Sequence, residues 1–396
     1  MREQPSLTPL LLLSTCLPIA GAGWTNRAYA QRDKWADPPY APLSQKTPKV
    51  VADLPSFGEI QWAVERLPFV PRGPHGGISG MGMVVHKDQV YLMGGFIPAG
   101  DETKDPKSRR TSRWTYRYEP KRRQWTRLPD MPSRREYTRA IATQDAIYVC
   151  GGAIQMKGSD PPYAPSAAVF KLDLTKQPLA WHECMGLTIP RTHMAVGCVG
   201  KHLVVAGGNE YDATKRGYHR STIRATTDVL DLSAPRAGWR QRAPLPDPPR
   251  GWTASAVCQG RFYVLGGLTF SAEGKAIRLR EAWCYDVAAN RWTPRAAPPL
   301  AISGWEGAVY ADRYIITVGG VAPSPTDREP VVWNDLPFVY DSRQDRWLKI
   351  ESSLPPGAVF NDPGVCIIGK TIYVAGAEGP RGSHFSHFLT GRIKAF

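Results

Sequence analysis

The chain has 396 residues, of which 42% are hydrophobic and 10% aromatic, a composition that supplies a large core and excludes intrinsic disorder. Its formal net charge is +15, but the basic residues are dispersed apart from short clusters such as KSRRTSR and KRRQWTR. Dispersed charge indicates a solvated basic surface, so we expect no nucleic-acid partner. With 37 glycines, 37 prolines and no long amphipathic helical pattern, the sequence predicts an all-β fold.

Residues 1–30 are predicted to be a secretory signal peptide. A mostly apolar run from Leu7 to Ala22 follows a basic N-terminus, and AYA, ending at Ala30, is a small-residue cleavage site. The run is too short and too rich in proline to span a membrane comfortably, and no later stretch predicts a stable membrane span. We therefore expect an exported protein, periplasmic or extracellular, whose residues 31–59 form a proline-rich N-terminal arm.

Short apolar runs that end in a glycine pair recur along the rest of the chain. The first residues of these pairs are separated by 57, 56, 59, 53 and 57 residues, and each of the first five pairs is followed by a tryptophan near a predicted turn. One copy therefore corresponds to about four short strands, which bury both faces only by stacking on neighbouring copies. The pairs begin at Gly94, Gly151, Gly207, Gly266, Gly319 and Gly376, and the tryptophans are Trp125, Trp181, Trp239, Trp292 and Trp347.

This recurring glycine pair, with a tyrosine before it and a tryptophan after it, resembles the kelch family over roughly residues 60–393. The resemblance implies a six-bladed kelch-type β-propeller with four-stranded antiparallel blades, occupying residues 60–396.

The two ends of the repeat array predict how the ring closes. The sixth copy lacks its tryptophan, because only 19 residues follow Ala377, whereas Trp62 precedes the first copy. We therefore expect the N-terminal strand, at residues 60–70, to join the C-terminal blade built from residues 358–393, since pairing both ends in one sheet removes a frayed edge.

The cysteines and histidines do not indicate a metal centre. Six cysteines remain after the signal peptide, and Cys198, Cys258 and Cys366 occupy nearly the same place in successive copies, so we expect free thiols rather than disulfides. No group has zinc-ligand spacing, and HFSH places His384 and His387 on opposite faces of a strand. We expect no metal and no cofactor.

The resemblance also implies that the first strand of each blade lines a central channel. Aromatic rings contact the C–H face of a sugar, and an arginine binds a carboxylate through two parallel hydrogen bonds. The residues at the expected channel mouth therefore predict a site for a small carbohydrate or sugar acid, unless the arginines cap loops and the tryptophans pack between blades. Fourteen residues before the glycine pairs stand Gly80, Tyr137, His193, Trp252, Trp305 and Asp362, and their neighbours include Arg135, Glu136, Arg191, Arg250, Glu306 and Asn361.

The third copy resembles the bacterial N-acetylneuraminate epimerase group, exported kelch propellers that interconvert sialic acid anomers. That group has Gly-Glu directly after the third repeat's strand and an Arg several residues later, before Thr-Asp. Here GGNEY offers Glu210 and IRATTD offers Arg224, with Asn209 inserted and Arg216 and Arg220 as alternative arginines. The resemblance implies Glu210 as the acid/base of anomer exchange and Arg224 as the group that holds the substrate carboxylate.

The sixth copy offers a second pair of this kind, Glu378 and Arg381.

Two functions of other classes are alternatives. One is a non-catalytic propeller that binds a glycan or a protein at the same channel mouth, because a fold of this type hosts many functions. The other is a copper enzyme resembling galactose oxidase, for which the eight scattered histidines provide no convincing Tyr–Cys–His set.

Overall fold

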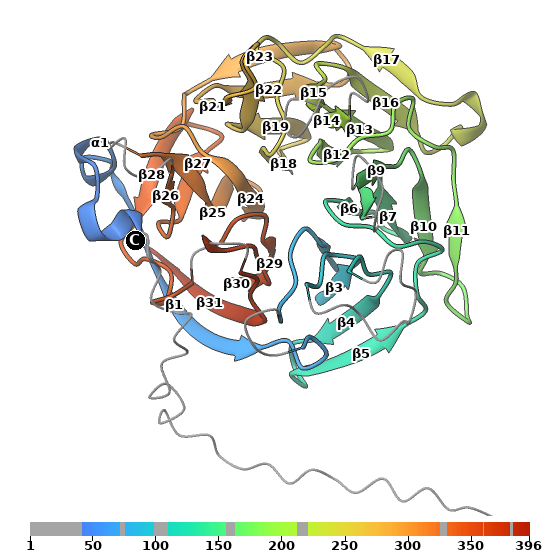
Figure 1. Ribbon diagram of the computed structural model, residues 1–396, viewed down its shortest axis with the longest axis horizontal. Helices are drawn as coiled ribbons and strands as arrows, with labels where there is room; N and C mark the ends of the chain where they lie inside the picture. The colour runs from blue at the N-terminus through green and yellow to red at the C-terminus, as the bar shows by residue number, and fades with distance from the viewer. Residues whose placement is uncertain are drawn as a thin grey trace, which may run out of the picture. The chain divides into compact units, whose positions relative to one another are not determined.

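Four copies of the repeat form separate four-stranded antiparallel sheets in the computed structural model (Figure 1). Each sheet runs in chain order from an inner strand to an outer strand, so the four-stranded antiparallel blade is confirmed. The sheets consist of β2 (Gly82–His86), β3 (Gln89–Met93), β4 (Thr115–Glu119) and β5 (Gln124–Leu128); β6 (Arg139–Ala142), β7 (Ala146–Cys150), β10 (Val169–Asp173) and β11 (Trp181–Glu183); β12 (Ala195–Val199), β13 (His202–Ala206), β16 (Thr227–Asp231) and β17 (Arg240–Arg242); and β18 (Ala254–Cys258), β19 (Arg261–Leu265), β22 (Ala282–Asp286) and β23 (Arg291–Arg295).

The fifth and sixth copies share one nine-stranded sheet, in the order β24-β25-β27-β28-β1-β31-β30-β29 with β26 paired to β25. The prediction of six separate blades is therefore wrong, because the N-terminal strand pairs on both of its edges. The strands are β24 (Ser303–Tyr310), β25 (Tyr314–Pro323), β26 (Val331–Trp333), β27 (Phe338–Asp341), β28 (Arg346–Ile350), β1 (Ser56–Arg66), β29 (Gly364–Ile368), β30 (Thr371–Ala375) and β31 (His387–Ala395).

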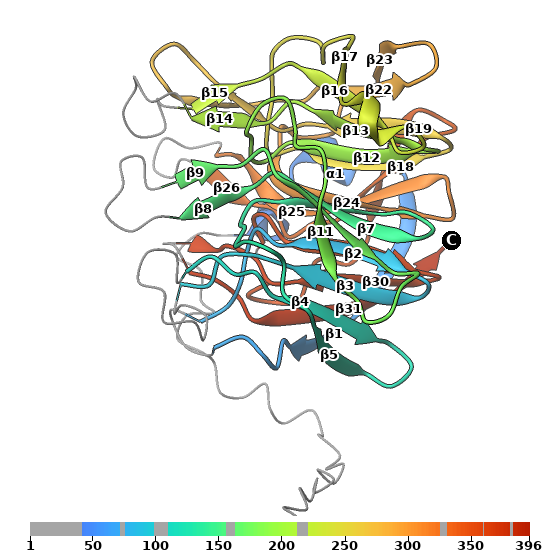
Figure 2. The same ribbon diagram turned by 90° about the vertical axis from the view of Figure 1, so that its right-hand side faces the viewer.

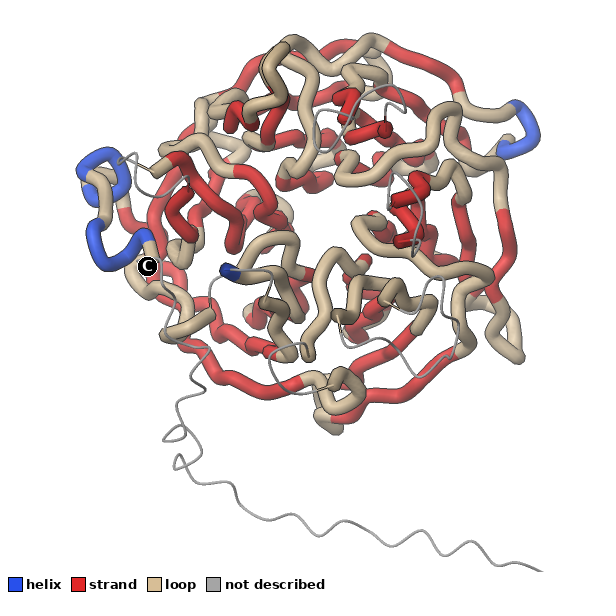
Figure 3. Tube along the Cα trace, in the orientation of Figure 1, coloured by secondary structure: helices blue, strands red, loops and turns tan. Residues whose placement is uncertain are grey.

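The structure describes residues 42–71, 76–98, 110–155, 163–211, 221–324, 331–358, 360–380 and 383–396, all within the unit Pro38–Phe396. Strands and loops make up nearly all of these residues (Figure 3). The helical segments are the 3-10 helices Leu43–Lys46 and Pro235–Ala237 and the helix α1 (Lys49–Ala52). None of the described helices is long and apolar enough to cross a membrane.

The N-terminal strand completes the C-terminal sheet, as the sequence predicts. β1 pairs antiparallel with β31 from Gly58↔Ala395 to Arg66↔His387, although it begins at Ser56 rather than at residue 60. Its other edge pairs in parallel with β28 through Ser56↔Lys349. The predicted signal peptide and the first part of the predicted arm lie outside the described residues. The rest of the arm contacts the fifth copy, where the Ser44 amide donates to Asp335 Oδ1 at 2.9 Å.

The inner strands contact one another in a closed cycle of β2, β6, β12, β18, β24 and β29. One backbone hydrogen bond recurs at every step of this cycle. The backbone amide of the second residue of each glycine pair donates to a backbone carbonyl of the next copy. That carbonyl lies two residues before the residue of the next copy that reaches the axis. The six bonds are Gly95 to Arg135 (2.7 Å), Gly152 to Arg191 (3.0 Å), Gly208 to Arg250 (2.9 Å), Gly267 to Ile302 (2.8 Å), Gly320 to Phe360 (2.5 Å) and Ala377 to Ile78 (2.7 Å).

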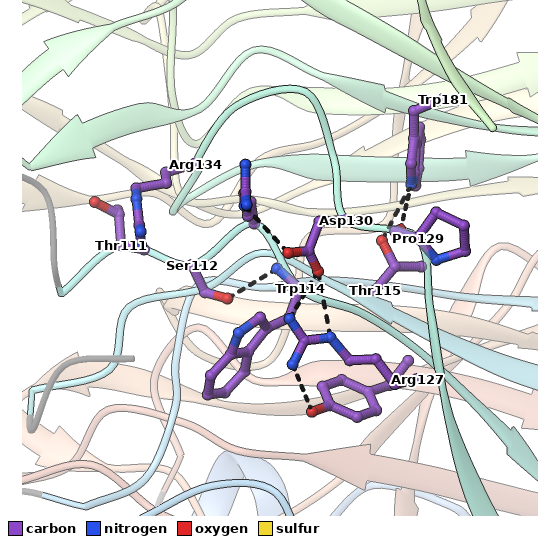
Figure 4. A network of polar contacts seen from close by, with 11 residues as sticks. Thr111, Ser112, Trp114, Thr115, Arg127, Pro129, Asp130, Arg134 and Trp181 are labelled. Carbon is purple, nitrogen blue, oxygen red and sulfur yellow. Dashed lines mark hydrogen bonds and ion pairs between the residues drawn. The ribbon is translucent and has the colours of Figure 1, made fainter. Parts of the chain in front are cut away.

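The repeated tryptophan provides a second contact between copies, at the outer edge. The Trp181 indole N–H donates to the Pro129 carbonyl at 3.0 Å and to Thr115 Oγ1 at 3.2 Å, both in the preceding copy (Figure 4). A buried indole needs such an acceptor, so the tryptophan joins apolar packing to a specific bond. The later copies repeat it from Trp239 to the Met185 carbonyl, from Trp292 to Ala243 and from Trp347 to Ala296.

All six cysteines that follow the predicted signal peptide are free thiols in the structure, as the repeat pattern predicts. Burial raises the pKa of Cys150 to about 12, so this thiol is uncharged and packs as a small apolar group.

Replacing Ile60 with Ala is expected to destabilise the protein by ~2–5 kcal/mol, because Ile60 is 2% exposed in the core between the fifth and sixth copies. Gln61→Ala, on the exposed face of the same strand, is the matched control and should change the free energy of unfolding by less than about 0.5 kcal/mol. Urea unfolding of both variants measures the difference. Equal effects would mean that β1 does not seal this core.

Candidate functional site

One residue of each copy lies at the axis with a left-handed backbone. We call these six residues the axial belt. Non-glycine residues adopt this conformation at a cost of ~1–3 kcal/mol each, and such residues cluster at functional sites. The belt consists of Gly80 (φ 60°), Tyr137 (50°), His193 (51°), Trp252 (53°), Gly304 (71°) and Asp362 (53°).

Backbone hydrogen bonds link the belt residues around the axis. The Gly80 amide donates to the Asp362 carbonyl at 3.2 Å, and Asp362 donates to Gly304 at 2.7 Å. The series continues from Gly304 to Trp252 (2.9 Å), from Trp252 to His193 (3.0 Å) and from His193 to Tyr137 (3.4 Å). The inner strands are therefore drawn together at this level, and the belt separates two cavities.

Trp305 is not a belt residue, which corrects the position inferred from the sequence. The β24–β25 hairpin turns through three residues, 311–313, where the equivalent hairpin β2–β3 turns through two, so counting back from Gly319 misses the belt by one. Gly304 occupies the belt instead. Trp305 is fully buried, donates its indole N–H to the Leu265 carbonyl at 3.1 Å and stacks on Trp347, so it packs between copies.

The cavity above the belt has a volume of about 440 Å³, within the ~300–1,000 Å³ range of ligand sites. It opens among short hairpins that start directly after the glycine pairs: β8 (Ala153–Gln155) with β9 (Tyr163–Pro165), β14 (Asn209–Tyr211) with β15 (Ser221–Ile223), and β20 (Leu268–Phe270) with β21 (Ala276–Arg278). Figure 2 shows β8, β9, β14 and β15 on the same side of the sheets, which we call the hairpin face. The cavity is lined by Tyr137, Ala153, Thr192, His193, Asn209, Trp252, Leu268, Phe270, Gly274, Ala276, Arg278, Ser303, Val321, Asn361, Asp362 and Glu378.

One wall of this cavity is aromatic. The ring centroids of Tyr137 and His193 lie 4.2 Å apart, and those of His193 and Trp252 lie 4.0 Å apart with the rings nearly parallel. Phe270 meets Trp252 edge to face at 6.1 Å. The Thr192 hydroxyl contacts His193 Nδ1 at 2.8 Å and orients the imidazole. Burial lowers the pKa of His193 well below its usual value, and the charge of Arg139 adds to this shift, so the ring is neutral.

The sixth copy supplies an acidic wall. The Asn361 amide nitrogen donates to Asp362 Oδ2 at 3.1 Å and to Glu378 Oε2 at 3.3 Å. Burial raises the pKa of Asp362 to about 6, although Arg139 opposes the shift, and burial together with the Asp362 charge raises the pKa of Glu378 to about 7. Behind them the pKa of the fully buried Glu136 is raised well above its usual value, chiefly by burial.

Two acceptor atoms of this cavity lack partners. Asp362 Oδ1 and Asn209 Oδ1 have no hydrogen-bond partner among the described residues, and the two side chains belong to residues only 2% and 3% exposed. A buried acceptor without a donor is costly, so a ligand that donates hydrogen bonds would satisfy both. Within the described part of the chain, no three His, Cys, Asp or Glu side chains gather as a metal ion would require.

Below the belt an ion pair crosses the axis. Arg139 of β6 lies 2.6 Å from Glu306 of β24, and these strands belong to opposite copies in the cycle. Burial raises the pKa of Glu306 to about 7, an effect that the Arg139 charge opposes and the Asp362 charge increases. Both side chains line a second cavity of about 290 Å³ that is otherwise mostly apolar. Glu306 is therefore not in the upper cavity where the sequence placed it.

Three of the predicted site arginines, Arg135, Arg191 and Arg250, lie outside the cavity lining and bind within their own copies. Arg135 donates to Ser166 Oγ at 2.8 Å, and Arg250 donates to Glu281 Oε2 at 3.2 Å. Arg191 donates to Asp228 and to Thr226 Oγ1, the second at 2.9 Å. The prediction that these arginines line the channel mouth is therefore wrong, because the residue two positions before the belt turns its side chain into the blade. The sequence had offered this packing role as the alternative.

Glu210, the predicted acid/base of the third copy, is also outside the cavity lining. Glu210 lies in β14, and Arg224 follows directly after its partner strand β15. Arg224 Nε donates to Glu210 Oε2 at 2.6 Å. The pair is half-exposed and neutralises its own charge. Asn209, the residue that seemed inserted, faces the cavity instead, because side chains alternate along a strand. Arg216, Arg220 and Arg381 lie outside the described residues.

Six of the residues that the sequence places at the site come together in one cavity: Tyr137, His193, Trp252, Asn361, Asp362 and Glu378. The sequence reasoning missed Asn209, Phe270 and Arg278. The repeat contained a signal for Asn209, because the position directly after the glycine pair recurs in every copy. At four of the other five such positions the residue also lines the cavity: Ala153, Leu268, Val321 and Glu378. No repeat pattern marks Phe270 or Arg278, because the equivalent hairpins of the second and third copies carry other residue types at these places.

The fold and this axial cavity define a kelch-type β-propeller with a ligand-sized cavity at one face. The kelch motif family model matches residues 78–132 and 250–299. Kelch-like protein terF of Aspergillus terreus is 28% identical over 264 residues, covering 64% of this chain and 52% of that protein. Kelch-like protein 36 of Mus musculus is 26% identical, covering 65% of this chain and 38% of that protein. These matches support the kelch-repeat family for this chain.

The chain thus spans about half or less of the length of these relatives. It is also similar to the N-acetylneuraminate epimerase of Haemophilus influenzae, with 31% identity over 92 residues. That match covers 23% of this chain and 24% of that protein, so it supports kelch repeats and does not establish the epimerase group.

Asp362→Asn is expected to flatten the pH dependence of stability between about pH 4 and 7. The folded pKa of Asp362, about 6, lies above its usual 3.8, so its stabilising contribution is complete below pH 3.8 and lost as pH rises through 6. Across this pH range Asp362 should lower the free energy of unfolding of the wild type by about 1–3 kcal/mol, and this decrease should be absent in the variant. Asn is suitable at this position because it tolerates the left-handed backbone at φ 53°.

Urea unfolding at a series of pH values measures this slope, and Glu351→Gln, at an exposed carboxylate, is the control. His193 opposes the trend at acid pH in wild type and variant alike, so the comparison reports Asp362 together with the part of the Glu378 and Glu306 shifts that the Asp362 charge causes. Parallel pH profiles for wild type and Asp362→Asn would contradict a desolvated carboxyl in the cavity.

Proposed function

We propose that this protein is a non-catalytic recognition propeller that binds a partner protein at its hairpin face, with the axial cavity receiving one side chain of that partner. The observation that carries the proposal is the pair of buried acceptors without donors, Asp362 Oδ1 and Asn209 Oδ1, in a cavity of ligand size. The predicted signal peptide would bring the protein to the periplasm or the extracellular space.

The axial belt supports a binding function, because its backbone conformation does not require the large side chains that four of its residues carry. Two copies have glycine at this position, which adopts φ near 60–70° without strain. The Tyr, His, Trp and Asp residues of the other four copies adopt the same conformation at a cost, and all four project into the cavity. Side chains that cost stability and line a cavity are typical of a functional site.

The aromatic wall supports a partner that inserts a side chain. Trp and Tyr are enriched among the residues that dominate binding energy, where they fill desolvated pockets surrounded by weaker contacts. Trp252 stands at the end of the aromatic stack beside Phe270, so one of its neighbours is already fixed in place. The hairpins around the mouth provide the rim of such an interface.

The relatives and the position of Glu210 favour binding over catalysis. The matches that cover about two thirds of the chain are to kelch-like proteins, whereas the epimerase match covers 23%. The carboxylate and the arginine assigned to anomer exchange bind each other outside the cavity lining. A base that is already paired with its intended substrate clamp has neither group free for the reaction.

Trp252→Asn is expected to weaken binding of selected peptides at least about tenfold, because truncating a central aromatic residue of an interface costs ~2 kcal/mol or more. A random peptide library and a glycan array, screened in parallel against the purified protein, would provide the ligands. Asn keeps the left-handed backbone of residue 252, and Met185→Asn, at a side chain 49% exposed outside the cavity, is the matched control. Enrichment of glycans without peptides would overturn the proposal.

A sugar-acid mutarotase is the second candidate, and the raised pKa of Glu378 favours it. With a pKa of about 7, this cavity carboxyl exchanges protons near neutral pH, as an acid/base for anomer exchange requires. On this reading the carboxylate of the sugar binds Arg278 across the cavity. NMR of freshly dissolved N-acetylneuraminate would show accelerated anomer exchange that is lost in Glu378→Gln and kept in Glu210→Gln. Exchange at the uncatalysed rate with wild type would exclude this candidate.

A further inference from the structure

On the basis of the proposed function, we infer that the side chain received by the axial cavity is cationic, a lysine ammonium or an arginine guanidinium of the partner protein. The cavity offers such a group two carboxyls, an unpartnered amide oxygen and an aromatic wall.

The first step is the shortage of positive charge near the acidic wall. Asp362 is almost completely buried, and its Oδ1 has no hydrogen-bond partner among the described residues. The nearest imidazole atom, His193 Nε2, lies 3.9 Å from Asp362 Oδ2, and burial lowers the pKa of His193 so that the ring carries no charge. Arg139, the closest guanidinium below the belt, is engaged by Glu306 at 2.6 Å.

The second step is the balance of charged groups that face the cavity. Asp362 and Glu378 line it, and Glu136 lies close enough to interact electrostatically with Glu378. Among the described lining residues, Arg278 on β21 is the one basic side chain other than the neutral His193. Arg278 belongs to the fourth copy and the two acids belong to the sixth. A bound cation at the acidic wall would therefore replace the water that burial has removed from these carboxyls.

The third step is the aromatic wall. A cation is attracted to the face of an aromatic ring, most strongly to Trp, within about 6 Å of the ring centre. Tyr137, His193 and Trp252 stack side by side on this wall, and Asn209 Oδ1 adds an acceptor in the same cavity. A planar guanidinium or an ammonium on an alkyl chain uses both walls at once, with its charge on the carboxyls and its apolar stem on the rings.

The fourth step is size. The cavity of about 440 Å³ is far larger than a bare metal ion needs, and the described residues do not form a metal-ligand cluster. It has room for the end of a long side chain entering from the hairpin face. A neutral hydroxyl ligand would also satisfy the two free acceptors, so the distinguishing property is charge.

Propylguanidinium and propylurea test the charge, since the two probes share their planar shape and propyl stem, whereas propylurea is neutral and carries a carbonyl oxygen in place of one NH2 group. Chemical-shift titration of the full chain should show propylguanidinium binding at least about tenfold more tightly than propylurea at about pH 7.5. The affinity should fall about tenfold or more toward pH 5, because protonation of Asp362 and Glu378 removes the negative charge that holds the cation.

Asp362→Asn should weaken propylguanidinium binding about tenfold and reduce its pH dependence, while binding of propylurea changes little. Glu378→Gln provides an independent variant at the same wall, and Glu351→Gln is the exposed control that should match wild type. Equal affinity for the two probes, no measurable binding of propylguanidinium, or tighter binding of propionate through Arg278 would each overturn the inference.

The peptides selected on the hairpin face separate this inference from the proposed function. If they bind through Trp252 and lose about tenfold or more in affinity when their Lys or Arg residues are replaced by Gln, the inference is supported. If they bind through Trp252 and tolerate that replacement, a partner protein is recognised but its anchor is not cationic. If no peptide binds while propylguanidinium does, the cation site stands and the protein partner is the part that fails.

Discussion

The backbone bond between each glycine pair and the next copy is the constraint on which the rest of the structure depends. A Cβ on the first glycine of any pair would lie 2.3–2.7 Å from the carbonyl oxygen of the next copy, closer than a side chain can approach. Glycine is therefore required at this position by contact with the neighbour as well as by its positive φ. In the first five pairs the second position also excludes a side chain, because a Cβ there would lie 2.5–2.8 Å from a neighbouring atom. In the sixth copy Ala377 stands at this position with φ 147°, and its N–H donates to the Ile78 carbonyl at 2.7 Å and connects the last copy to the first.

This bond also creates the site. The accepting carbonyl belongs to the residue two before the belt, so fixing it in each copy brings the belt residues close enough for the five backbone hydrogen bonds that run from Gly80 through Asp362 to Tyr137. The belt closes the channel and leaves an upper cavity with aromatic and acidic walls and a lower cavity crossed by Arg139 and Glu306. Since glycine suffices for the backbone in two copies, the side chains of the other four are available for recognition.

Burial gives the upper cavity its chemical character. Burial of Asp362 and Glu378 outweighs the opposing charge of Arg139 on Asp362, so their carboxyls ionise only near neutral pH. The stability lost on ionising them in the empty cavity is the free energy that a cationic ligand would recover on binding. In the proposed function, recognition of a cation and the pH dependence of stability are consequently two effects of the same desolvated carboxyls.

The sequence by itself determined the repeat, the four-stranded unit, the pairing of the N-terminal strand with the C-terminal sheet, and six of the residues in the cavity. These follow from demands that every copy repeats, such as the close approach at Gly94 or the indole bond of Trp181, and repetition makes them visible. Only the tertiary structure decided which residues reach the axis. One extra residue in the 311–313 turn moves Trp305 from the belt into the core, and β1 fuses two blades by pairing on both edges. Strand alternation sends Glu210 to Arg224 and Asn209 to the cavity, because the direction of a side chain depends on local register, which residue spacing does not record.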